Sequence, residues 1–134
     1  MKHVRYAAAA ALTVGLVTTG ASVAPAHASH GGGGDRVTHN GACEGGARWK
    51  IKAKEDDGRI EVEAEIDSNR SGQRWTWVLA HNGSRSAHGN ARTAGRSGSF
   101  SVERKLVDAR GADAFTFRAT HGDQVCVAKV RWTA

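Results

Sequence analysis

The chain has few cysteines and lacks an apolar run long enough to span a membrane. Its N-terminal apolar segment, residues 7–17 (AAAAALTVGLV), is shorter than the about 20 residues that a transmembrane helix needs. The sequence holds two cysteines, Cys43 and Cys126, and neither directly follows that segment. We therefore expect neither a lipoprotein signal nor a transmembrane segment.

The motifs of common catalytic and metal sites are also absent. No GxSxG nucleophile turn, phosphate-binding loop or unpaired reactive cysteine occurs, and the adjacent Asp56 and Asp57 fit turn chemistry. The later histidines match no zinc spacing; they are His30, His39, His81, His88 and His121. Of these, His81 and His88 are the only pair worth considering as metal ligands. We predict a protein that is not an enzyme and that has no cofactor and no metal site.

The N-terminus has the pattern of an export signal. Lys2 and Arg5 precede the apolar segment, and Ala26-His27-Ala28 follows it as a small-x-small cleavage site. Ala24-Pro25-Ala26 is a second possible site. We predict a signal peptide over residues 1–28 and a secreted, extracellular protein with one domain.

The two cysteines form an even pair in a chain that we expect to be exported. Such a pair predicts one disulfide, Cys43–Cys126, and the alternative is two buried free thiols. The bridge would join the first predicted strand to the last one.

Residues 47–67 (ARWKIKAKEDDGRIEVEAEID) predict the fold. Apolar and charged residues alternate on both sides of Asp57-Gly58, which is typical of two half-buried strands joined by a type I′ turn. A turn at 57–58 fixes the register, because a slip of one residue would bury the charged side chains. The predicted charged pairs are Lys54–Glu61, Lys52–Glu63, Lys50–Glu65 and Arg48–Asp67.

The rest of the chain predicts a single all-β domain over residues 43–134. Residues 29–42 are rich in glycine and predict a flexible leader. Residues 73–81 are apolar on both faces and predict an interior strand. Residues 82–98 hold little apolar bulk and predict either a long loop or an edge strand near 84–92. Further strands are expected over 99–106, around 115–119 and over 124–132. The fold class is an antiparallel immunoglobulin-like sandwich of six or seven strands.

Four tryptophans raise the possibility of a surface on which sugar rings stack. Trp49, Trp75, Trp77 and Trp132 all fall on the apolar side of their predicted strands. We therefore predict that they form the core.

Residues 113–122 (DAFTFRATHG) resemble the aromatic corner and sixth strand of fibronectin type III and bacterial immunoglobulin-like modules. Phe115 takes the place of the corner tyrosine, without its hydroxyl, and Ala119 lies on the strand that follows. The Ala-rich N-terminus and the preference for Arg over Lys resemble small, uncharacterised secreted proteins of high-GC Gram-positive bacteria. The resemblance implies a sandwich fold and carries no known activity.

Charge is unevenly distributed along the chain. Residues 55–67 hold seven acids and one arginine, whereas residues 68–102 hold no acid. Guanidinium groups in this second segment suit phosphate or sulfate, and the alternative is a solvated loop. The candidate binding residues are Arg70, Arg74, Arg85, Arg92 and Arg96.

These features predict a secreted binding or structural module, expected to be a monomer. Its partner is unknown from sequence, and an anionic extracellular polymer or an extracellular protein would suit the basic segment. Residues 82–98 contain no aromatic residue, which disfavours stacking of nucleic-acid bases there. The alternative function is a soluble inhibitor of an extracellular hydrolase that presents residues 82–98 as an insertion loop.

Overall fold

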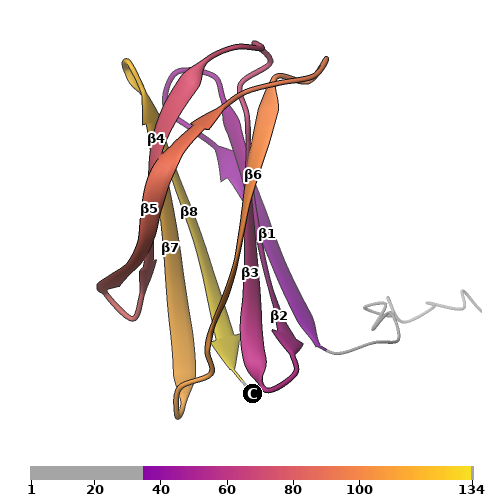
Figure 1. The fold of residues 1–134 in the computed structure, drawn as a ribbon, viewed down its shortest axis with the longest axis vertical. Coiled ribbons are helices and arrows are strands. Elements are labelled where there is room, and N and C mark those ends of the chain that lie inside the picture. The colour runs from indigo at the N-terminus through magenta and orange to yellow at the C-terminus, as the bar shows by residue number, and fades with distance from the viewer. Residues whose placement is uncertain (1–34, 134) are drawn as a thin grey trace, which may run out of the picture.

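The computed structural model describes residues 35–133, which form eight β-strands in two antiparallel sheets (Figure 1). Sheet A has the order β1-β2-β3-β6 and sheet B the order β5-β4-β7-β8. The predicted signal peptide, residues 1–28, lies outside the described residues. The strands are β1 Arg36–Ala42, β2 Arg48–Asp56, β3 Arg59–Asp67, β4 Arg74–His81, β5 Ser84–Arg92, β6 Ser99–Val107, β7 Ala112–His121 and β8 Gln124–Thr133.

The predicted antiparallel sandwich is confirmed, with eight strands in the described residues instead of six or seven. If β1 is set aside, sheet A holds β2, β3 and β6, and sheet B holds β5, β4, β7 and β8. Strands A, B and E of immunoglobulin-type domains are likewise separated from C, F and G, with C′ beside C. No helix of the described part of the chain is long and apolar enough to cross a membrane.

The hairpin of β2 and β3 has the predicted register. Arg48 lies opposite Asp67 at one end, and Lys54 lies opposite Glu61 near the turn. Asp57 and Gly58 have positive φ angles of 52° and 74°, as a type I′ turn requires. Local turn chemistry and the alternation of side chains therefore suffice to define this hairpin.

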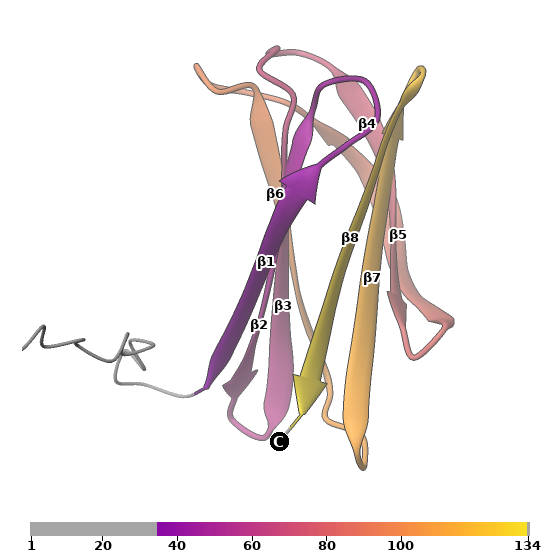
Figure 2. The same ribbon diagram turned by 180° about the vertical axis from the view of Figure 1, so that it is seen from behind.

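The prediction that residues 29–42 form a flexible leader is wrong for residues 36–42. These residues form β1, which pairs with β2 along its whole length. Gly41 lies opposite Trp49, and a Cβ added to Gly41 would come within 2.6 Å of the ring atom Cζ2. His39 Nδ1 also lies 3.1 Å from the Lys129 carbonyl oxygen of β8, which runs beside β1 (Figure 2). Gly41 therefore makes room for the Trp49 ring. The folded domain begins before Cys43, with β1.

Residues 82–98 form an edge strand and two connections, not one long loop. Asn82 and Gly83, with φ angles of 49° and 83°, turn the chain from β4 into β5. Gly89 lies opposite Trp77, and a Cβ there would be 3.0 Å from ring atom Cζ2. The Trp77 ring of the neighbouring strand covers Gly89, as aromatic residues often cover glycine at sheet edges. A small residue is therefore suited to this position of the edge strand. The insertion loop on which the inhibitor hypothesis depended is therefore not present.

The tryptophans pack in the core, as predicted. Trp75, Trp77 and Trp132 are buried, and Trp49 is half-buried against the same cluster. Arg104 of β6 interrupts the apolar alternation of that strand, and its guanidinium carbon lies 5.2 Å from the centroid of the Trp77 ring. This cation–π contact explains why an arginine stands at an inward position of an edge strand.

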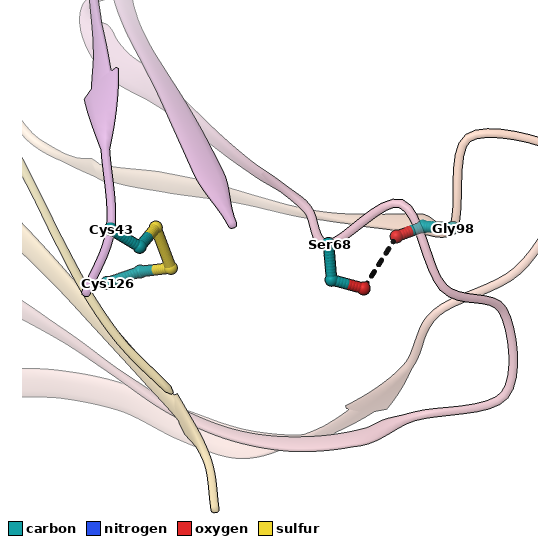
Figure 3. Close-up of a disulfide and its surroundings, with 4 residues drawn as sticks. All are labelled: Cys43, Ser68, Gly98 and Cys126. Atoms are coloured by element: carbon teal, nitrogen blue, oxygen red, sulfur yellow. Dashed lines mark hydrogen bonds between the residues drawn. A yellow bond between two sulfur atoms is a disulfide. The ribbon is translucent and has the colours of Figure 1, made fainter. Parts of the chain in front are cut away.

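Cys43 and Cys126 form the predicted disulfide (Figure 3). Next to it, the backbones of Glu44 and Val125 exchange two hydrogen bonds of 3.0 and 3.2 Å. The bridge therefore joins the β1–β2 connection of sheet A to the beginning of β8 in sheet B. We call this end of the sandwich the disulfide end.

Near the corner before β7, the carboxylate of Asp113 makes the bond that a tyrosine hydroxyl makes in immunoglobulin-type sandwiches. Asp113 is buried, its Oδ1 accepts a hydrogen bond from the backbone N of Ala109 at 3.2 Å, and it lies 2.5 Å from His81 Nε2. The His81 ring stacks on Phe115 with centroids 4.7 Å apart. A corner tyrosine would make the bond to the upstream backbone. Loss of hydration and the neighbouring Asp113 carboxyl raise the pKa of Asp108 in this corner.

Candidate anion-binding face

The structure brings four of the five predicted binding residues to the disulfide end. Arg74 and Arg92 lie directly opposite each other in the β4–β5 ladder. Arg70 lies in the β3–β4 connection and Arg96 in the β5–β6 connection, both at the same end. Arg85, opposite Ala80, lies at the other end of β5 and does not join them. Four of the five predicted binding residues therefore lie at the disulfide end, and Arg85 lies at the other end.

The two connections at this end, residues 68–73 and 93–98, are joined by hydrogen bonds. Ser68 Oγ donates to the Gly98 carbonyl at 3.2 Å (Figure 3). The buried Thr93 hydroxyl donates to the Arg70 carbonyl at 2.5 Å and accepts from the Gln73 backbone N at 2.9 Å. A Cβ on Gly98 would lie 2.3 Å from the Arg70 backbone N, so the two backbones are in close contact. Arg70 and Arg96 therefore project from an ordered base.

The outer face of sheet B carries exposed positive charges. Alternation buries Trp75, Trp77 and Leu79 of β4, which leaves the intervening side chains on the outside. Among the described residues, the one carboxylate of the sheet B strands is Asp113, which is buried on the inner side. We define the basic face as five of these exposed cations, Arg74, Arg92, Arg118, Lys129 and Arg131. A sixth, Arg85, is exposed on the same side opposite Ala80, at the other end of β5 from Arg92.

Three of these residues were not among the predicted site residues. Arg118 of β7 lies opposite Val78 of β4 and Val127 of β8. Lys129 and Arg131 belong to β8, far from residues 68–102 in sequence. Alternation along β8 places Lys129 and Arg131 on its exposed side, but only the order of strands in the sheet shows that they share a face with Arg74.

The basic face crosses all four strands obliquely. Arg74 and Arg92 lie at the disulfide end of β4 and β5, Arg118 lies further along on β7, and the β8 cations continue toward the opposite end. With about 3.3 Å per residue along a strand and about 4.8 Å between strands, the path from Arg92 to Arg131 is about 30 Å long. This length suits an extended polymer better than a single small molecule.

The outer face of sheet A has a different electrostatic character. Lys52 Nζ lies 3.5 Å from Glu63 Oε1, and Lys54 Nζ lies 3.1 Å from Glu61 Oε1. Asp56 Oδ2 lies 2.7 Å from Lys105 Nζ, and this hydrogen bond lowers the pKa of Asp56. The strands of sheet A thus carry eight basic residues beside seven acids, and three of the lysines form ion pairs.

By contrast, within residues 35–133 none of the five basic-face residues forms an ion pair. The strands of sheet B carry six Arg and Lys residues and one acid, so the net positive charge of the strands is concentrated on this sheet. This face therefore has the capacity to attract an anion.

The two histidines considered as metal ligands lie on opposite sides of sheet B. His81 points inward to Asp113, whereas His88 is exposed and lies opposite Val78. No group of three or more histidine, cysteine or acidic side chains in the described part of the chain is arranged to hold a metal ion. The face is thus built from guanidinium and ammonium groups, which bind anions.

At the disulfide end the basic face contains an open hollow lined by Arg74, Asn90, Ala91 and Arg92. Arg92 Nη1 donates to the Gly72 carbonyl at 3.1 Å, and Asn90 Oδ1 accepts from Thr76 Oγ1 at 3.1 Å. The charged and polar groups that line it are two guanidinium groups and one amide. A scan against models of protein families finds no match for this chain, and searches of curated proteins and of solved structures find no significant similarity.

Proposed function

We propose that this protein is a secreted, non-enzymatic binding module that holds anionic extracellular polymers on its basic face. The observation that carries the proposal is the outer face of sheet B, which has six exposed cations, five of them in the basic face, and, among the described residues, no carboxylate. The strands of sheet A carry nearly as many acids as basic residues, so the imbalance is specific to sheet B.

The chemistry of the face favours recognition of backbone charge. Guanidinium groups present forked donors that match phosphate and sulfate oxygens. The tryptophan and phenylalanine rings of sheet B are buried, so this face offers them to no base or sugar ring. Binding releases counterions from the polymer and must weaken as salt increases. With five contacts, the logarithm of the binding constant should fall with a slope of about 4 against the logarithm of salt concentration.

Secretion is supported by two observations. The N-terminal residues have the pattern of a cleavable signal peptide, and the Cys43–Cys126 disulfide is of a kind that persists in oxidising compartments. Extracellular polymers with phosphate or sulfate groups would then be accessible to the basic face.

The test is retention of the mature protein on an immobilised sulfated polysaccharide. The variant Arg74→Gln, Arg118→Gln, Arg131→Gln should elute at clearly lower salt than the wild type. The matched control Lys50→Gln, Lys52→Gln, Lys54→Gln removes the same charge from sheet A and should elute close to the wild type. If both variants eluted at equally lowered salt, retention would depend on the net charge of the protein and not on the basic face. A wild type that is not retained above low salt would refute the proposal.

A further inference from the structure

We propose that Arg74, Arg92 and Asn90 form a discrete subsite for one tetrahedral oxyanion, a phosphate or sulfate group. The inference rests on the proposed function and deepens it, because it identifies which group of the polymer is gripped and where. Arg74 and Arg92 lie directly opposite each other, where cross-strand neighbours have Cβ atoms about 4.5–5.5 Å apart and like charges are destabilising.

Elsewhere in this protein, some directly opposite cross-strand positions hold residues of opposite charge. In the β2–β3 ladder, lysines lie opposite glutamates and form ion pairs. Arg74 and Arg92 are both exposed, so the core requires neither of them. An anion between the two guanidinium groups would convert an unfavourable pair into a favourable one.

The backbone around the pair is well fixed. The Arg74 carbonyl accepts a hydrogen bond from His121 Nδ1 at 2.7 Å, and the His121 ring stacks on Trp75. The Arg92 guanidinium donates to the Gly72 carbonyl, and the Gly72 backbone N in turn donates to the Thr93 carbonyl at 2.6 Å. The subsite is therefore preorganised, which lowers the entropy lost on binding.

The groups around the hollow are donors. Thr76 Oγ1 donates a hydrogen bond to the side-chain carbonyl oxygen of Asn90. The side-chain NH₂ of Asn90 is therefore the group that can donate to a ligand. Two guanidinium groups and one amide can donate to several oxygens of one phosphate or sulfate. The ligand can come from a polymer repeat or from free inorganic anion, and both present the same oxygens.

The experiment measures thermal unfolding and direct binding of inorganic phosphate at constant ionic strength. Arg74→Gln removes one guanidinium of the subsite, and Arg110→Gln is the control, since Arg110 is exposed in the β6–β7 connection and does not belong to the basic face. In chloride alone, Arg74→Gln should unfold at a higher temperature than the wild type, because the repulsion is removed. Phosphate should raise the midpoint of the wild type and of Arg110→Gln, and should raise that of Arg74→Gln much less.

Titration calorimetry should show phosphate binding at least tenfold weaker to Arg74→Gln than to Arg110→Gln. Arg74→Lys keeps the charge without the fork and should also bind phosphate more weakly than the wild type. An equal response to phosphate in the wild type and Arg74→Gln would overturn the subsite.

The polymer column distinguishes this outcome from failure of the proposed function. If phosphate has no specific effect while the polysaccharide is still retained through Arg118 and Arg131, the basic face binds polymers without a subsite. If phosphate binds but polysaccharide is not retained, the subsite serves a small anion and the polymer proposal fails.

Discussion

At the scale of single residues, Thr93 links the candidate site to the fold. Its side chain is buried between the two connections and its hydroxyl both donates and accepts a hydrogen bond. Its neighbour Arg92 reaches back to the β3–β4 connection through Gly72. A small polar residue inside the sandwich end thus determines where the arginines on the surface lie.

We predict that Thr93→Val lowers the free energy of unfolding by about 1–3 kcal/mol, because valine has nearly the same shape, leaves the Gln73 N–H without its partner and removes one of the two hydroxyl donors to the Arg70 carbonyl. Urea unfolding measures the change. Ser97→Ala in the same connection removes an exposed hydroxyl and should alter stability by less than about 0.5 kcal/mol. A Thr93→Val protein as stable as wild type would show that the hydrogen bonds do not hold the connections together.

At the scale of strands, a strand could be predicted when the residues that define it lie within one short segment of the sequence. The β2–β3 hairpin was predicted to the residue because Asp57-Gly58 and the alternating charges lie within one short segment. β1 was missed because it has a weak apolar pattern and pairs through its backbone, and its glycine fits only in the presence of Trp49. The ambiguity of residues 82–98 has the same cause, since Gly89 is explained by Trp77 on the neighbouring strand.

The close fit of β1 against Trp49 gives a prediction at this scale. Gly41→Ala should lower the free energy of unfolding by about 1–3 kcal/mol, because the added methyl group must displace the Trp49 ring or shift the strand. Chemical denaturation gives the stability, and amide hydrogen exchange of residues 36–42 shows whether β1 loosens. Asn40→Ala, an exposed change one residue away, is the control and should have little effect. Unchanged exchange and stability in Gly41→Ala would mean that β1 does not pack on this ring.

At the scale of the whole molecule, the candidate site depends on the order of strands in sheet B. The sequence does not reveal this order. Residues 68–102 are basic in sequence, so Arg74 and Arg92 could be predicted. Arg118 could not, because it joins them only when β7 lies beside β4. Arg85 was included for its place in the sequence, although β5 carries it to the far end of the strand. Charge along a chain therefore predicts a basic face only in part.

The disulfide also acts at the scale of the whole molecule, because it joins the two sheets. Its cysteines are separated by 83 residues in sequence, and closing a loop of that length in the unfolded chain is worth about 4–5 kcal/mol in the chain-entropy model, which is an upper estimate. The double variant Cys43→Ala, Cys126→Ala should therefore lose up to this amount of stability, measured by urea unfolding. Peptide mapping of the wild type without reduction should show one cross-linked pair, and two alkylatable thiols would contradict the bridge.

The same variant should nevertheless keep its affinity for anionic polymers at temperatures where it stays folded. All five basic-face residues lie on sheet B, and the ladders between β5, β4, β7 and β8 hold them in place without sheet A. Elution of the double variant from the polysaccharide column should thus match the wild type within the error of the gradient, with circular dichroism as the control for folding. A folded variant that elutes much earlier would show that the contact between sheets at the disulfide end shapes the basic face. In that case the site would belong to the assembled sandwich and not to one sheet.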